Sequence, residues 1–347
     1  MPPEVLTQRH LNRALLARQL LLERGRGGIP RTLERVGGIQ AQYAPSMYVG
    51  LWSRIEGFER EQLTRALERR SVAQGTLLRI TIHLVSAGDW WPFAVAVREA
   101  RRRWLLTNRA EAGGARRLEP AARKLRAAMA GGSMTTAEIR SLLGKALGYN
   151  APLWIDMVRV PPSGTWDRRR ADLYACAEDW LGPPDGALDV DAAVDHLVRS
   201  CLRGFGPMPG ADVANFTGVA AADVAASLER LELRTFVDEQ GKELVDLPRA
   251  PLPDPDTPAP VRFLPVWDAT MLLATIRRTG IFPERHRAAL ANTSYPQAAP
   301  LFLVDGVVAG AWKFEAGRVR MDPFEKLDRA TLRALREEAE RLTDFAR

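Results

Sequence analysis

Cysteine and histidine are scarce in this chain of 347 residues, and each scarcity excludes a class of protein. The two cysteines, Cys176 and Cys201, are too few for a disulfide framework and form no Cys-x-x-Cys pair, so we expect a reducing cytoplasm. The four histidines are scattered without the spacing of metal ligands, and no His-Glu-x-x-His motif occurs. We therefore expect neither a metal site nor a cofactor.

Long apolar segments are also missing. No run of 18 apolar residues occurs, and no signal-peptide core follows Met1. These absences predict a soluble cytoplasmic protein without a membrane partner. The length of the chain is ample for two or three domains with sizeable cores.

Lysine is the third scarcity, because five lysines stand against 44 arginines in a chain with a net charge of +7 and a pI of about 9.8. The positive balance favours an anionic partner, with nucleic acid first. Arginine can bind a phosphate through two parallel N–H bonds, which suits this partner better than lysine does. A GC-rich genome, which encodes arginine readily, explains part of the same bias.

The most informative stretch is Gly37-Gly38-Ile39-Gln40-Ala41-Gln42. Its two glycines predict that a helix expected over 30–36 ends at Gly37. In an extended chain, residues i and i+2 point the same way, so Gln40 and Gln42 would present two neutral amides to one side. Such a pair can hold a water molecule or a polar ligand in a fixed orientation without adding charge. The alternative is that the two amides cap the preceding helix or lie in solvent.

A second stretch, Leu77 to Val85, is rich in β-branched residues and predicts a strand. Thr81 and His83 share one face of this strand, so we take both as possible lining residues of the same site, together with Tyr43. His83 is equally compatible with a structural role as a hydrogen-bonded histidine.

Arginines gather at several points of the chain. A helix expected to begin after Ser86 ends in a basic run, which is either a solvated face or a stripe directed at phosphate. We predict phosphate contacts for arginines in this run and in two later segments, namely Arg101, Arg102, Arg168, Arg169, Arg170, Arg277 and Arg278.

An internal repeat organises the middle of the chain. Met134-Thr-Thr-Ala-Glu-Ile-Arg-Ser-Leu-Leu-Gly144 aligns with Met208-Pro-Gly-Ala-Asp-Val-Ala-Asn-Phe-Thr-Gly218 at an offset of 74 residues. Each copy follows a longer helix, expected over 118–130 and 191–204, and each precedes a hairpin. The order helix, helix, turn, helix, hairpin is typical of a winged helix, so we predict two tandem winged-helix units.

The stretch Gly38-Ile-Gln-Ala-Gln42 resembles the Gln-apolar-Gln motif of the AlkZ/YcaQ-type bacterial DNA glycosylases. Four further segments carry the resemblance in the same order, namely Thr81-Ile-His-Leu-Val-Ser86, Gly164-Thr-Trp-Asp167, Leu264-Pro-Val-Trp-Asp268 and Val304-Asp-Gly-Val-Val-Ala-Gly310. The resemblance implies that Gln40 and Gln42 are a catalytic pair and that the phosphate contacts are made with DNA. One branch of the family has Asp in place of the second glutamine, whereas this chain is similar to the branch linked to self-resistance against DNA-alkylating natural products.

The resemblance completes the predicted fold, which is mainly α with small β elements, built from tandem winged-helix units and a small C-terminal β-barrel. It makes residues 1–117 a divergent N-terminal unit that carries the glutamine loop. The internal repeat makes 118–187 and 188–250 the second and third units. After a proline-rich linker, a predicted β-meander and a final helix in 261–347 form the barrel region.

Three functions compete at this point. The first is a monofunctional DNA glycosylase, a hydrolase that removes N7-alkylguanine from double-stranded DNA, possible substrates including bulky or interstrand-crosslinked adducts. The second is a non-catalytic winged-helix transcription regulator, and the third is a structural scaffold. A regulator would normally be a symmetric dimer, whereas tandem units in one chain favour a monomer, which we place at the nucleoid. Repeat and charge fit the first two hypotheses equally, so the glutamine loop and the resemblance favour the glycosylase.

Overall fold

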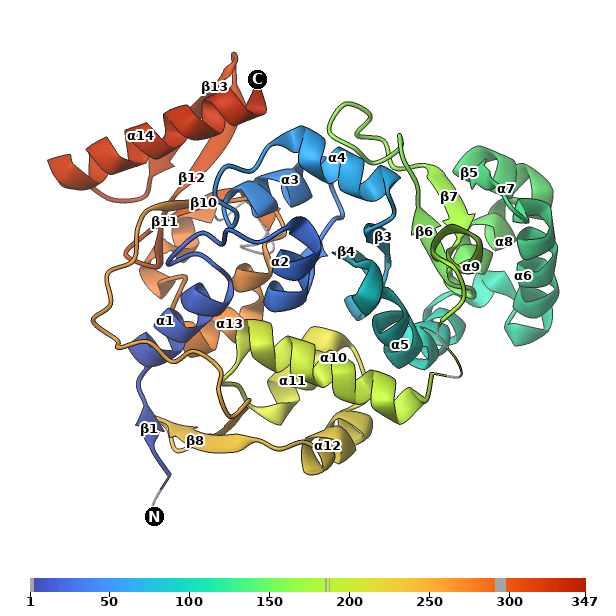
Figure 1. The fold of residues 1–347 in the computed structure, drawn as a ribbon, viewed down its shortest axis with the longest axis horizontal. Helices are drawn as coiled ribbons and strands as arrows, with labels where there is room; N and C mark the ends of the chain where they lie inside the picture. Colours follow the sequence, from blue (N-terminus) through green and yellow to red (C-terminus); the bar gives the residue numbers. More distant parts are fainter. Residues whose placement is uncertain (1–2, 185, 187, 291–297) are drawn as a thin grey trace.

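The computed structural model describes residues 3–184, 186, 188–290 and 298–347. The structure is mainly helical with several small sheets, as predicted (Figure 1). The α-helices are α1 (Gln8–Arg18), α2 (Ile29–Val36), α3 (Ala44–Trp52), α4 (Arg60–Glu68), α5 (Ala87–Asn108), α6 (Ala115–Met129), α7 (Thr136–Leu143), α8 (Lys145–Asn150), α9 (Ala177–Leu181), α10 (Val190–Phe205), α11 (Gly210–Thr217), α12 (Ala221–Arg230), α13 (Leu273–Thr279) and α14 (Arg329–Ala346). Short 3-10 turns are η1 (Leu78–Ile80), η2 (Ala110–Ala112), η3 (Ala151–Leu153), η4 (Ala269–Met271) and η5 (Glu284–Leu290).

A six-stranded sheet in the order β2-β4-β3-β6-β7-β5 carries the glutamine stretch. Its strands are β2 (Ile39–Gln40), β3 (Val72–Thr76), β4 (Ile82–Ser86), β5 (Ser133–Thr135), β6 (Met157–Arg159) and β7 (Leu173–Cys176). All the neighbouring pairs are antiparallel. The sheet therefore joins the region before residue 117 to the first copy of the repeat.

The prediction of one continuous strand from Leu77 to Val85 is wrong in its first half. Leu77 to Thr81 form a turn between β3 and β4, because Arg79 and Ile80 adopt left-handed φ angles of 51° and 59°. A non-glycine residue in this region costs on the order of 1–3 kcal/mol, so the surrounding structure has to hold the turn in place. No glycine or asparagine in the sequence signals it.

The internal repeat is visible in the order of the elements. α7 and α11 begin 74 residues apart, at Thr136 and Gly210, and each is followed by a second helix and a two-stranded hairpin. The hairpins are β6–β7 in the first copy and β8 (Arg234–Asp238) with β9 (Glu243–Asp246) in the second. This is the order that the winged-helix prediction requires.

The second hairpin is not free at its edge. β1 (Val5–Leu6) pairs with β8 in parallel, which gives a three-stranded sheet in the order β1-β8-β9. A parallel pairing between the first residues of a chain and residues more than 200 positions later leaves no local pattern in the sequence.

The C-terminal region is an open sheet, so the predicted β-barrel is not confirmed. β10 (Arg262–Leu264), β11 (Leu301–Val304), β12 (Val307–Glu315) and β13 (Arg318–Pro323) follow one another in an antiparallel meander. Among the described residues, no pairing joins β10 to β13, and α14 packs on the sheet instead. Four strands are few for a closed barrel, which needs enough strands to bend the sheet onto itself.

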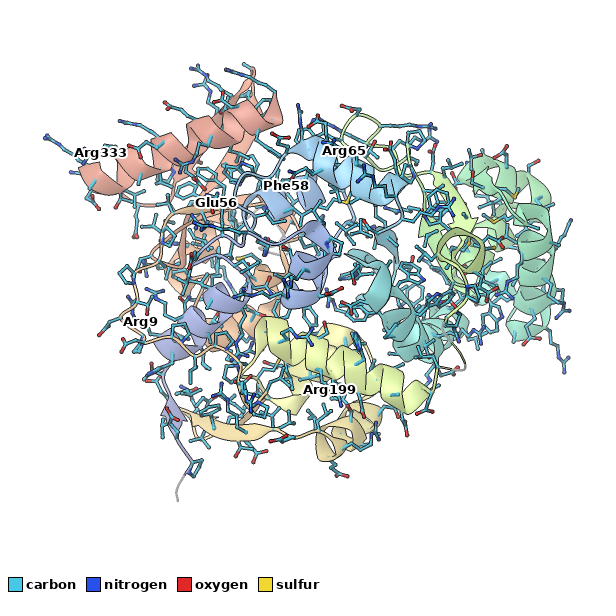
Figure 2. The ribbon with its side chains drawn as sticks, in the orientation of Figure 1. Arg9, Glu56, Phe58, Arg65, Arg199 and Arg333 are labelled. Atoms are coloured by element: carbon cyan, nitrogen blue, oxygen red, sulfur yellow. The ribbon has the colours of Figure 1, made fainter. Side chains whose placement is uncertain are left out.

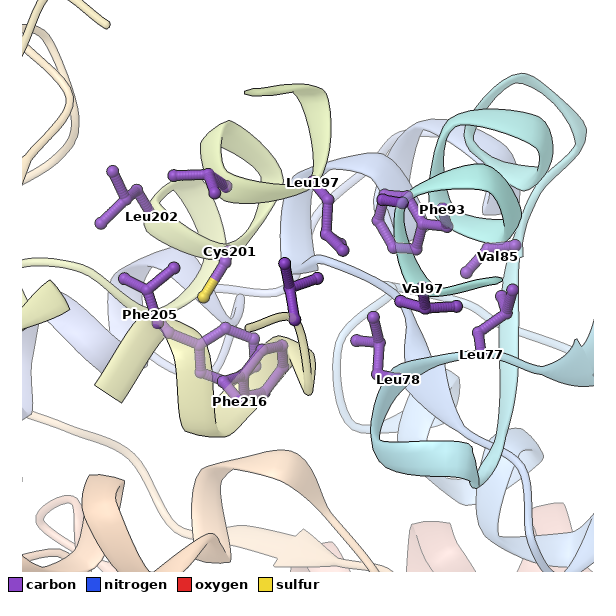
Figure 3. Close-up of a cluster of buried hydrophobic side chains, with 14 of the residues drawn as sticks. Leu77, Leu78, Val85, Phe93, Val97, Leu197, Cys201, Leu202, Phe205 and Phe216 are labelled. Carbon is purple, nitrogen blue, oxygen red and sulfur yellow. The ribbon is translucent and has the colours of Figure 1, made fainter. Parts of the chain in front are cut away.

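One buried cluster packs the N-terminal region, through α5, against α10 of the second copy of the repeat. Figure 3 shows Leu77, Leu78 and Phe93 facing Leu197 and Cys201 across the interface between α5 and α10. Phe205 and Phe216 lie at the far side of the same cluster with their ring centroids 4.3 Å apart and their ring planes tilted by 41°. Apolar burial of this kind contributes roughly 25 cal/mol per Å², so the α5–α10 contact stabilises the fold.

Candidate active site

The glutamine stretch leaves α2 as the sequence predicts and then joins a sheet. Gly37 ends the helix in the left-handed conformation with φ 78°, and Gly38 follows with φ 81°. A Cβ on Gly38 would lie 3.0 Å from a methyl group of Val85 and 3.2 Å from the Leu84 carbonyl oxygen. The glycine pair therefore lets β2 approach β4 closely enough to pair with it.

Gln40 is buried, with 8% of its surface exposed, and pairs directly with His83 across β2 and β4. Its side-chain amide makes no hydrogen bond among the described residues. The amide atoms are nevertheless not fully enclosed, so a water molecule can reach them. This amide is therefore available to a ligand and not to the fold.

Gln42 is exposed, and its amide oxygen has a structural partner. The backbone N–H of Ile82 donates to Gln42 Oε1 at 3.2 Å, while the N–H of Ala41 donates to the Ile82 carbonyl oxygen at 2.7 Å. The side chain of Gln42 thus takes the place that the next backbone carbonyl would hold in a regular ladder. Neither glutamine caps α2, because the cap of that helix is Gly37.

His83 is almost fully buried, with 2% of its surface exposed. Its Nδ1 donates to the carbonyl oxygen of Thr81 at 3.1 Å, and the Thr81 hydroxyl donates to the carbonyl of Leu78 at 3.0 Å. Burial and the neighbouring Arg79 guanidinium lower the pKa of His83 to about 3. The imidazole is therefore neutral near pH 7, with its proton on Nδ1 and a bare lone pair on Nε2.

A family model described as DNA glycosylase AlkZ-like matches residues 33–345. The chain belongs to the AlkZ-like DNA glycosylase family. Among solved structures, it is similar to the DNA glycosylase AlkZ of Streptomyces sahachiroi, with a TM-score of 0.80 and 17% identity over 99% of this chain and 97% of that one. A search of curated proteins finds no match.

Family membership confirms the first functional hypothesis at the level of reaction class, which is DNA base excision by a glycosylase, and makes DNA the partner. No helix among the described residues is long and apolar enough to cross a membrane. In the same part of the chain, no three His, Cys, Asp or Glu side chains gather as metal ligands would.

In this AlkZ-like glycosylase, the loop between β6 and β7 reaches the glutamine stretch. The Arg169 guanidinium donates to the Tyr43 hydroxyl at 3.5 Å and lies 5.5 Å from the ring of Trp166. Tyr43 is 45% exposed, and Arg168 and Arg170 extend from the same loop with exposed side chains. The structure therefore brings Arg169 to Tyr43, while Arg168 and Arg170 lie beside Arg169 in the loop and form ion pairs with Asp172.

The other four predicted arginines have internal partners or lie elsewhere. Arg101 is 2% exposed and forms an ion pair with Asp156 at 2.6 Å, and Arg278 forms a buried ion pair with Asp212. Arg102 stacks on Trp154 and donates to the carbonyl of that residue. Burial removes Arg101 and Arg278 from the candidate phosphate contacts.

Arg277 is exposed, but it lies on a different surface of the molecule. It lines a cavity of about 780 Å³ between α11, α13 and the β8–β9 turn. Gln40 and Gln42 are not among the residues that line this cavity. The predicted arginines therefore do not form one continuous stripe.

Arg79 is a residue of the site region that the sequence did not single out. It lies in the strained turn between β3 and β4, and it donates to the Phe216 carbonyl oxygen at the end of α11 while its guanidinium carbon lies 4.9 Å from the Phe216 ring. Burial lowers the pKa of Arg79 to about 10. A single arginine inside a stretch that predicts a strand does not indicate this contact with Phe216.

Proposed function

We propose that this AlkZ-like glycosylase hydrolyses the N-glycosidic bond of cationic N7-alkylguanine in double-stranded DNA, with Gln40 and Gln42 as its catalytic residues. One observation carries the proposal: the buried amide of Gln40 has no partner among the described residues and stands at the end of β2, two residues before Gln42. The positive charge of the chain and the exposed arginines of the β6–β7 loop support DNA as the surface on which this amide acts.

The charge of the lesion explains why neutral side chains suffice. An N7-alkylated guanine is cationic and leaves as a neutral base, so it needs little help from a general acid. What remains is to hold a water molecule near C1′ and to stabilise a sugar that becomes oxocarbenium-like. The Gln40 amide oxygen accepts a hydrogen bond from that water and aligns it.

Gln42 has a second task in this scheme. Its oxygen is held by the Ile82 N–H, so its amide dipole is fixed before any substrate arrives. An amide oxygen carries two acceptor sites, and the one that Ile82 does not use is available to the developing positive charge. A dipole oriented in advance stabilises charge without reorganising during the reaction.

The exposed residues beside the amide pair favour a bulky lesion. Gln42 and Tyr43 are both exposed, so the chain that follows Gln40 lies at the surface, and we propose an open approach to the Gln40 amide. An open entrance admits adducts that a closed base pocket would reject, including interstrand crosslinks formed by a genotoxic natural product. We place the enzyme in self-resistance and DNA repair, as a monomer acting at the nucleoid in the cytoplasm.

The test is single-turnover release of free base from duplex DNA containing N7-methylguanine. Gln40→Ala and Gln42→Ala should each slow release by on the order of a hundredfold or more, while DNA affinity stays within a few-fold. Gln240→Ala is the matched control, because Gln240 is an exposed glutamine at the distant β8–β9 turn, and its loss should leave the rate unchanged.

Duplex DNA containing 8-oxoguanine serves as the uncharged lesion and should release almost no base. Wild-type release rates in both glutamine variants would show that the pair is structural. Equal activity on the charged and the uncharged lesion would contradict the proposed role of the leaving-group charge.

A further inference from the structure

His83 stands opposite Gln40 in the register that brings side chains closest. Ala41 and Ile82 form the hydrogen-bonded pair next along the ladder, so the pair Gln40–His83 is of the non-hydrogen-bonded kind. In such a pair the Cα atoms lie about 4.5 Å apart and the two side chains project from the same face. The two unused polar groups of this sheet region therefore lie side by side.

The imidazole of His83 offers one chemical function to that face. Its Nδ1–H is committed to the Thr81 carbonyl, and its Nε2 has no partner among the described residues. Neither Nε2 nor the Gln40 amide belongs to the set of fully enclosed, unpartnered polar atoms of the described chain. Nε2 is therefore not fully enclosed, and we take it as an acceptor open to a single water molecule.

We propose that His83 is a further catalytic residue, whose Nε2 and the amide oxygen of Gln40 each accept a hydrogen bond from one O–H group of the attacking water. A water molecule that donates both of its hydrogen bonds to the protein has its lone pairs left for C1′. This inference rests on the proposed glycosylase function. It assigns to His83 the second hydrogen bond of the attacking water, for which the glutamine pair provides no acceptor.

The chemical step balances without any further reactant. The C1′–N9 bond breaks, and its electron pair leaves with the base and neutralises the N7 cation. The water oxygen bonds to C1′, and one of its protons passes to His83 Nε2 and from there to solvent. Because a protonated sugar hydroxyl is a strong acid, a weakly basic imidazole is sufficient to take the proton.

The surroundings of His83 keep it an acceptor at every working pH. The positions that face it on the neighbouring strands are Gln40 on β2 and Gly75 on β3, neither of which titrates. The charged side chain that acts on it is Arg79, which together with burial holds the pKa of His83 near 3. We therefore expect single-turnover base release by the wild-type enzyme to be independent of pH between about 5 and 8.

Two substitutions of His83 distinguish the effect of losing the Nε2 acceptor from the effect of losing the imidazole ring. His83→Asn keeps an N–H that can donate to the Thr81 carbonyl but has no atom at the place of Nε2, and should slow base release by about a hundredfold. His83→Gln can place an amide oxygen near Nε2 and should recover much of this loss. DNA affinity should stay within a few-fold in both variants. The double variant Gln40→Ala/His83→Asn should be little slower than the slower single variant, because both residues hold one water.

His286→Asn is the matched control, because His286 is also buried and also donates through Nδ1 to a carbonyl, that of Val308 at 2.9 Å. It should release base at the wild-type rate. A wild-type rate in His83→Asn, equal rates in the Asn and Gln variants, additive losses in the double variant, or an inflection of the wild-type profile between pH 5 and 8 would each overturn the inference. If the wild-type enzyme releases no base, the proposed function fails. If the His83 variants release base at the wild-type rate while the glutamine variants are slow, this inference alone fails.

Discussion

The two copies of the internal repeat share an order of elements but differ in charge. The helices of the first copy, α6 to α8, carry seven Lys or Arg residues and two Glu. The helices of the second copy, α10 to α12, carry three Arg and five acidic residues. A fold can therefore be repeated while the property that attracts a polyanion is kept in one copy only.

The copies also differ in what their hairpins contact. The first hairpin joins the sheet that carries Gln40, and its loop brings Arg169 to Tyr43. The second hairpin is covered at its edge by β1, and its turn lines the cavity beside α13. We infer that the first copy faces DNA and that the second supports the fold.

Both copies are fastened to the N-terminal region by a buried aspartate between two arginines. In the second copy, Asp246 is fully buried and binds Arg18 and Arg234. In the first copy, Asp156 binds Arg98 and Arg101 but keeps 11% of its side chain exposed. The comparison predicts that removing the buried aspartate costs more unfolding free energy in the second copy than in the first.

The largest expected effect is on stability, at the anchor of the second copy. Asp246→Ala leaves the buried Arg18 guanidinium without its bidentate partner, with its own N–H donors at 2.6 and 2.9 Å from the lost oxygens. Removing one partner of a buried pair costs about 3–5 kcal/mol, so we expect a loss of that size in the free energy of unfolding. Chemical denaturation measures it, with Asp223→Ala on the exposed side of α12 as the control. A loss below about 1 kcal/mol would mean that the pair contributes little.

The next effect is the pH dependence of the first anchor. Burial by itself raises the pKa of Asp156, but attraction by Arg101 and Arg98 outweighs it and lowers the pKa below its ordinary value of 3.8. A lowered pKa stabilises the fold above the unfolded value, and the contribution is lost as the pH falls through the folded value. The difference in unfolding free energy between the wild type and Asp156→Asn should therefore shrink as the pH falls below about 4. A difference that stays constant down to pH 2 would contradict this linkage.

Patterns local in sequence predicted much of the fold. Gly37 ends α2, the repeat has the expected elements, and the strands of the C-terminal meander lie where their alternation places them. Each of these features depends on a glycine, a cap or a period that neighbouring residues share. The same reasoning missed the turn at Arg79 and the pairing of β1 with β8, because neither has a local signature.

The residues of the proposed site were named from the sequence, but their geometry was not predictable. The sequence identified Gln40, Gln42 and His83, yet their roles depend on register, which pairs Gln40 with His83 and occupies the oxygen of Gln42. Register is fixed by long-range packing and not by the residues themselves. Counting arginines likewise did not distinguish exposed Arg169 from buried Arg101, because burial of a charge depends on a distant carboxylate.

The two hairpins should differ in their effect on DNA affinity. Arg169→Glu in the loop of the first hairpin removes a proposed phosphate contact and introduces repulsion beside Tyr43, so we expect affinity for duplex DNA to fall about tenfold, or about 1.4 kcal/mol. Lys242→Glu makes the same change of charge at the exposed turn of the second hairpin and should alter affinity by less than about twofold. Fluorescence anisotropy with undamaged duplex measures both. Equal losses would remove the distinction between the copies.

The smallest expected effect concerns the salt dependence of binding, and it compares the first helices of the two copies. Arg123 on α6 and Arg199 on α10 are both exposed, and Arg199 is labelled on its helix in Figure 2. Each phosphate that a side chain neutralises contributes about 0.9 to the slope of log affinity against log salt, because one condensed counterion is released. Arg123→Gln should therefore reduce the magnitude of the slope by about 0.9, the contribution of one phosphate contact. Arg199→Gln should leave the slope unchanged, because the acidic residues around α10 keep that helix away from the polyanion. If Arg199→Gln lowers the slope and Arg123→Gln does not, the DNA path runs over the second copy, and the charge difference between the copies has no bearing on where DNA binds.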